Sequence, residues 1–142
     1  MRISTLDTVQ NWIVVFKDDK ATGPWRWLTR RGFRHVLLIG YSPEWRVWVV
    51  YDPLFNGTFL QIADDTTIDA VIDGFERQGA VMLQVTTRRP AKVIWTLPPL
   101  YCVDLVKMVL GVSAWWVKTP FQLYRHLLRA HEAVGLLKPK EV

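Results

Sequence analysis

The sequence is poor in cysteine, because Cys102 is the only one among 142 residues. A single cysteine excludes an internal disulfide and argues against a structural zinc site, which takes several thiolate or imidazole ligands. The chain also has no apolar run near the ~20 residues of a membrane-spanning helix. Its N-terminal residues lack the apolar core of a signal peptide. We therefore expect a protein made in the reducing cytoplasm, with no transmembrane segment and no metal or other cofactor.

Dense clusters of one charge are also missing. The formal net charge is +5, but the basic residues are scattered, and the densest groups are the pairs Arg30–Arg31 and Arg88–Arg89. Without a recognition motif this charge does not predict specific binding of nucleic acid. Tryptophan, by contrast, is abundant, with eight copies. Because tryptophan is enriched at interfaces, we expect several of these side chains to lie against a partner.

The length and the 50% hydrophobic content predict one domain over residues 1–142. Runs of β-branched and aromatic residues predict strands, and the clearest hairpin has Pro53 directly after its second strand. The expected strands cover residues 12–16, 34–39, 46–52, 55–62, 80–86 and, as a short one, 93–95.

Three helices are expected. Ile68, Val71, Ile72 and Phe75 have the spacing of one apolar helix face, which ends at Gly79. The helix that starts near Cys102 and stops at Gly111 is apolar around most of its circumference, which favours a central position. Residues 119–122 form a capping box for a last helix, which runs to about residue 132. The fold class is therefore α+β: an antiparallel sheet packed on a central cysteine-bearing helix, with a C-terminal helix outside.

Cys102 is the first candidate for a functional residue. It follows the double proline Pro98–Pro99 at the start of its helix. Unpaired N–H groups and a partial positive charge at a helix N-terminus favour a thiolate. The alternative is a buried, inert thiol. A nucleophile would also need a base and, as a rule, a group that orients the base.

The histidines are the candidates for that base. His126 and His131 lie five positions apart on the last helix and do not share a face, so we interpret them as a partly exposed pair without a catalytic role. His35 instead begins an otherwise apolar strand.

The expected hairpin gives His35 a partner. If residues 42–45 form the loop, His35 lies opposite Asp52, and both side chains point to the same face. A shift of one residue would place Tyr51 opposite His35 instead. In a third interpretation His35 is a strand-end residue, and Asp52 only forms the turn before Pro53.

Three segments and a fourth, weaker one resemble the papain-like NlpC superfamily. They are residues 34–38 (RHVLL), 48–53 (WVVYDP), 101–111 (YCVDLVKMVLG) and 119–125 (TPFQLYR). Ordinary papain-like enzymes run Cys, His, then Asn or Asp, whereas the order here is His, acid, Cys. The chain is therefore similar to the circularly permuted branch, including its small members from phage and bacterial genomes. The resemblance covers residues 33–125 and implies a permuted papain-like fold.

This resemblance implies a catalytic triad, with Cys102 as nucleophile, His35 as general base and Asp52 as orienting residue. The third position varies in the permuted branch, which keeps Tyr51 as an alternative to Asp52. The implied chemistry is acyl transfer through a thioester, with backbone N–H groups at the helix start stabilising the oxyanion.

Two functions from different classes follow as hypotheses. The first is a cysteine peptidase or amidase acting on peptide cross-links of bacterial cell-wall peptidoglycan, or on another acyl substrate. The second is a non-enzymatic phage virion or tail-associated assembly protein that retains the fold and contacts other virion structural proteins. The two hypotheses are compatible, since a particle-borne hydrolase satisfies both. A nucleic-acid-binding protein is the least favoured.

Overall fold

The computed structural model describes residues 10–18, 29–54, 57–87 and 102–132. Within these ranges a five-stranded antiparallel sheet has the strand order β4-β3-β2-β1-β5. The strands are β1 (Gln10–Lys17), β2 (His35–Ser42), β3 (Val47–Leu54), β4 (Gly57–Ala63) and β5 (Val81–Thr87). The helices are α1 (Asp65–Arg77), α2 (Cys102–Leu110) and α3 (Pro120–Glu132). The predicted α+β class with an antiparallel sheet is confirmed.

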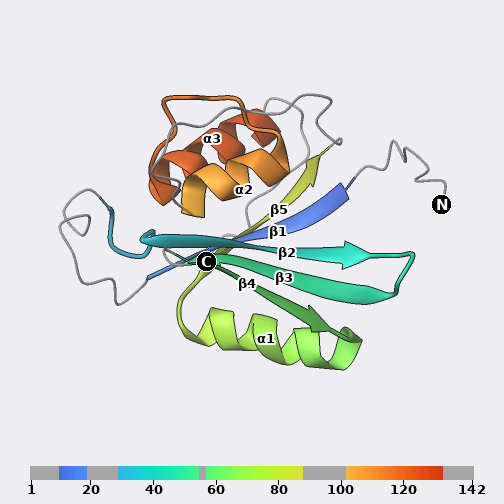
Figure 1. The fold of residues 1–142 in the computed structure, drawn as a ribbon. Helices are drawn as coiled ribbons and strands as arrows, with labels where there is room; N and C mark the ends of the chain where they lie inside the picture. Colours follow the sequence, from blue (N-terminus) through green and yellow to red (C-terminus); the bar gives the residue numbers. More distant parts are fainter. Residues whose placement is uncertain (1–9, 19–28, 55–56, 88–101, 133–142) are drawn as a thin grey trace.

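Helices cover both faces of the sheet, with α1 on one side and α2 and α3 on the other (Figure 1). This explains why β2 reads as a continuous apolar run, since a strand covered on both faces has no solvent side. Its successive side chains enter different cores. Leu37 and Ile39 join the cluster on the α1 side, and Val36 and Leu38 join the cluster on the α2 and α3 side. Each of these four residues is fully buried.

Helix α1 forms where its apolar spacing predicts. Ile68 is buried, and Val71, Ile72 and Phe75 pack against the same cluster. The carboxylate of Asp64 caps the first turn by accepting from the backbone N–H of Thr67 at 2.7 Å. The chain leaves the helix through Gly79, whose φ of 76° is accessible to glycine at little cost. The expected strand at residues 93–95 lies outside the described residues.

Helix α2 begins at Cys102, as expected, and the chain turns away at Gly111, where φ is 71°. Its burial is one-sided: Val103 and Val106 lie in the core, whereas Met108 is 37% exposed. The helix therefore lies with α3 in a layer over the sheet, and its expected central position is not confirmed. Because two helices share this face, each needs only one buried stripe.

The predicted end of β3 is wrong. Pro53 is not a terminator but a buried strand residue opposite Thr58 of β4. The pairing of β3 with β2 ends at Tyr51, opposite Leu38, while the pairing with β4 continues to Leu54. On the β2 side Pro53 therefore interrupts no ladder, and a strand tolerates proline at such an edge.

The predicted register of the β2–β3 hairpin is wrong by two residues. Tyr41 lies opposite Trp48, and Ile39 opposite Val50. The physical reason is the turn at residues 43–46, in which Arg46 has a φ of 53° and so belongs to the loop and not to the strand. A shift of two residues preserves the alternation of faces, however, so the set of side chains on each face is unchanged.

Among the described residues no helix combines the length and the apolar character that crossing a membrane requires.

Candidate functional site

The end of the sheet where β2 and β3 part brings His35 and Asp52 together. His35 is the first residue of β2 and is 6% exposed. Its Nε2 lies 2.5 Å from Oδ1 of Asp52 on β3, a short hydrogen bond in which the imidazole N–H donates to the carboxylate. The expected contact is therefore present. It arises although the two residues do not face one another in a ladder, because β2–β3 pairing stops at Leu38 and Tyr51.

Cys102 completes this group from the first turn of α2. The thiol side chain is partly buried and lies close enough to the His35 imidazole to raise its pKa. Burial lowers the pKa of His35, but the hydrogen bond to Asp52 and the proximity of Cys102 outweigh it and raise that pKa to about 9. The imidazole is therefore positively charged at neutral pH, with a proton on each ring nitrogen.

The structure thus brings together the three residues that sequence reasoning selected. The imidazole lies between the sulfur and the carboxylate. A thiol acyl-transfer site has its base between the nucleophile and the orienting group in the same way. Tyr51, the alternative third residue, packs against the core on the α2 and α3 side and lies opposite Leu38. In the described hydrogen bond of the imidazole, the acceptor is the carboxylate of Asp52. The catalytic role of these residues stays a prediction.

The other histidines are not part of this group. His126 is a half-buried residue of α3 whose ring meets the edge of Trp116 at 6.4 Å between centroids. The side chain of His131 and the double proline before Cys102 lie outside the described residues.

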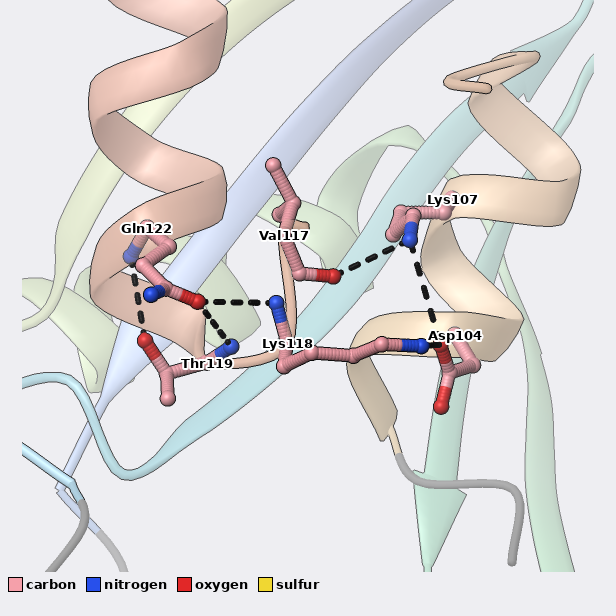
Figure 2. Close-up of polar contacts among 6 residues, drawn as sticks. All are labelled: Asp104, Lys107, Val117, Lys118, Thr119 and Gln122. Carbon is pink, nitrogen blue, oxygen red and sulfur yellow. Dashed lines mark hydrogen bonds and ion pairs between the residues drawn. The ribbon is translucent and has the colours of Figure 1, made fainter. Parts of the chain in front are cut away.

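A buried polar network holds the cysteine helix in place (Figure 2). Asp104 and Lys107 belong to α2 and are 3% and 2% exposed. Lys107 Nζ donates to the backbone carbonyl of Val117 at 3.0 Å and lies 3.9 Å from Asp104 Oδ1. Lys118 Nζ approaches the same Oδ1 at 3.7 Å. The segment before α3 is thereby fastened along α2, whose first residue is Cys102.

The same segment is fixed to α3 by the predicted capping box (Figure 2). Thr119 Oγ1 accepts from the backbone N–H of Gln122 at 3.2 Å, and Gln122 Oε1 accepts from the backbone N–H of Thr119 at 3.1 Å. Gln122 Oε1 also accepts from the N–H of Lys118 at 2.8 Å. Residues 117–119 therefore connect the two helices that cover this face of the sheet.

Sequence reasoning missed the Asp104–Lys107 pair. Burial lowers the pKa of Lys107, while the charge of Asp104 acts in the opposite direction and that of Lys118 reinforces the lowering. An available signal was an acid and a base at positions i and i+3 inside an otherwise apolar helix. Such charges are kept in a core only where they meet partners.

Among the residues that the structure describes, no group of three or more His, Cys, Asp or Glu side chains could hold a metal ion. Comparison of the chain with protein-family models, with curated proteins and with solved structures gives no match.

Proposed function

We propose that the protein is a cysteine hydrolase of the peptidase or amidase type, with Cys102 as nucleophile, His35 as general base and acid, and Asp52 as orienting residue. One observation carries this proposal: the His35 imidazole is hydrogen-bonded to the Asp52 carboxylate and lies close enough to Cys102, in the first turn of a helix, for that residue to raise its pKa.

In the proposed reaction the proton of the Cys102–His35 pair already lies on the imidazole, and the sulfur attacks the carbonyl carbon of an amide. The carbonyl oxygen becomes an oxyanion, which backbone N–H groups in the first turn of α2 stabilise. The C–N bond then breaks, and the leaving amine takes the proton from the imidazolium. His35 next removes a proton from water, which attacks the thioester and releases the carboxylic acid and the free thiol.

Asp52 keeps the imidazole in the required orientation and stabilises its protonated form, as the raised pKa of His35 indicates. His35 is buried and Asp52 is half-buried, which limits the access of water to the hydrogen bond and so strengthens it. As substrate we propose peptide cross-links of the bacterial cell wall. The support for this choice is the resemblance of residues 34–38, 48–53 and 101–111 to the NlpC superfamily.

The test follows the thioester directly. Because Cys102 is the only thiol of the chain, any covalent acyl adduct on sulfur reports on this site. Purified protein is mixed with peptidoglycan fragments that carry intact peptide cross-links and is quenched with acid. We expect an added acyl mass on the peptide that contains Cys102, and release of a free amine and a carboxylate from the fragments.

Two variants make this test decisive. Cys102→Ala should lose both the adduct and the hydrolysis. His35→Gln should lower the rate of adduct formation by about a hundredfold or more, as expected for loss of a general base. Hydrolysis that persists at the wild-type rate in Cys102→Ala would refute the proposed triad.

A further inference from the structure

Two neighbouring tryptophans stand out on the segment between α2 and α3. Trp115 is 75% exposed and Trp116 is 58% exposed. Their rings meet edge to face, with 6.1 Å between centroids and 87° between planes. Indole has a large apolar surface, and a contiguous exposed apolar patch marks an interaction site.

The backbone that carries these rings is anchored on both sides. The flanking residues Ala114 and Val117 are 4% and 1% exposed and belong to the core. The N–H of Val117 donates to the carbonyl of Ala114 at 3.3 Å, and the carbonyl of Val117 accepts from buried Lys107 (Figure 2). The backbone that carries the rings is therefore held in place before any partner arrives, which lowers the entropic cost of binding.

Helix α3, which contacts Trp116, carries exposed positive charge. Trp116 contacts His126 of α3, and exposed Arg129 follows His126 by three positions, on the same side of the helix. Arg125 is also exposed. Among the side chains that the structure describes, neither arginine pairs with an acidic residue. The surface thus combines exposed indole with exposed guanidinium groups.

We propose that Trp115, Trp116, Arg125 and Arg129 form a docking surface for a membrane that contains anionic phospholipids. Tryptophan prefers the interface of a bilayer, where its ring enters the acyl boundary and its N–H stays hydrated. Arginine pairs with lipid phosphate, and each basic residue near an anionic surface adds to the attraction. This role is separate from the proposed catalysis, because none of the four residues belongs to the Cys102 group.

The orientation of the rings favours lipid over single-stranded nucleic acid. Bases bind by stacking flat on successive aromatic faces. The two indoles stand nearly perpendicular to one another, so they offer no common stacking platform. Insertion of the indoles into the fluid interface of a bilayer does not require the two rings to be parallel.

The experiment measures sedimentation of the Cys102→Ala protein with vesicles, so that catalysis plays no part. One set of vesicles contains phosphatidylcholine alone, and the other contains phosphatidylglycerol in addition. We expect binding to the anionic vesicles, weakened at high salt. Trp115→Ser/Trp116→Ser and Arg125→Gln/Arg129→Gln should each lower the affinity about tenfold or more.

Trp45 provides a matched control. It lies in the turn between β2 and β3 and is 74% exposed, nearly the same as Trp115. Trp45→Ser should leave vesicle binding unchanged, and unaltered circular dichroism should show that every variant is folded. The proposal is overturned if neither double variant weakens binding, or if Trp45→Ser weakens it equally. It is also overturned if the protein does not bind the vesicles and instead binds a single-stranded oligonucleotide through the same four residues.

Discussion

At the scale of single residues, the proton on His35 couples the candidate site to the stability of the fold. An imidazole whose pKa rises from 6.5 in the unfolded chain to about 9 in the native state binds its proton more tightly when folded. Its stabilising contribution is present in full below pH 6.5 and is lost as the pH rises through about 9. We therefore expect the free energy of unfolding to fall across this window, as measured by urea titration at several pH values.

The control for this prediction exchanges one histidine at a time. His35→Gln should remove most of the decline in stability over that pH window, because glutamine does not titrate. His126→Gln, on α3 and away from the thiol, should keep it. An identical pH dependence in wild type and His35→Gln would contradict the assignment of the raised pKa to His35.

A second residue-scale prediction separates Asp52 from Tyr51. Asp52→Asn removes the carboxylate whose hydrogen bond raises the pKa of His35, so that pKa should fall. Tyr51→Phe removes only a hydroxyl from a residue that packs against the core, and the pKa of His35 should stay raised. Titration of the imidazole signals by NMR measures both. A lower pKa in Tyr51→Phe and not in Asp52→Asn would reverse the roles.

Some residues around this site were predicted from the sequence and others were not, for a simple physical reason. Side-chain alternation in strands survives a register error of two residues, so His35 and Asp52 remained on the same face although the expected pairing was wrong. The buried Asp104–Lys107 pair was not predicted, since its partners come from residues 117–118, beyond the turn after α2. No local pattern specifies that contact.

At the scale of elements, Lys107 fastens α2 to the segment before α3. Lys107→Met keeps the aliphatic volume but leaves the Val117 carbonyl without its buried donor. We expect a loss of about 1–3 kcal/mol in the free energy of unfolding. Lys118→Met, at a side chain that is 55% exposed, should cost less than about 1 kcal/mol. Urea denaturation measures both, and equal losses would contradict the structural importance of the buried contact.

Alanine substitutions at two glycines should change the stability in opposite directions. In β2, a Cβ added to Gly40 would lie 2.5 Å from Cζ3 of Trp12 on neighbouring β1, so Gly40→Ala should cost about 1–3 kcal/mol. In α1, a Cβ at Gly74 meets nothing within 4 Å, and Gly74→Ala should stabilise by about 0.5–1 kcal/mol. Thermal unfolding gives both signs. Shortening Trp12 in the Gly40→Ala background should recover part of the loss, which would not happen if the strain lay elsewhere.

The start of α3 was predictable, because capping is local: Thr119 and Gln122 act within one turn of the helix that they begin. Asp64 caps α1 in the same local way but was not predicted. The end of β3 was not predictable from Pro53, because a proline stops a strand only where a neighbour needs its N–H. That condition depends on where β2 and β3 part, which is a property of the sheet.

At the scale of the whole molecule, one sheet supports two hydrophobic clusters. The central strands β1 and β2 contribute side chains to both, and in β2 the neighbours Leu37 and Leu38 enter opposite clusters. The sequence did not reveal that α1 alone covers one face while α2 and α3 share the other. Apolar periodicity identifies the buried side of a helix but not the face of the sheet that it meets.

This shared sheet predicts cooperative unfolding of both layers. Leu37 and Leu38 are each fully buried, so Leu37→Ala and Leu38→Ala should each cost about 2–5 kcal/mol. Because the cavity forms in a strand that both helical layers need, either substitution should lower the protection of amide hydrogens in α1 and in α2 by similar factors. Native-state hydrogen exchange resolves the two helices. If Leu37→Ala lowered the amide protection of α1 while α2 kept its wild-type protection, the two clusters would be separate folding units. Substitutions on the α1 face of the sheet would then leave the stability of the candidate site at α2 unchanged.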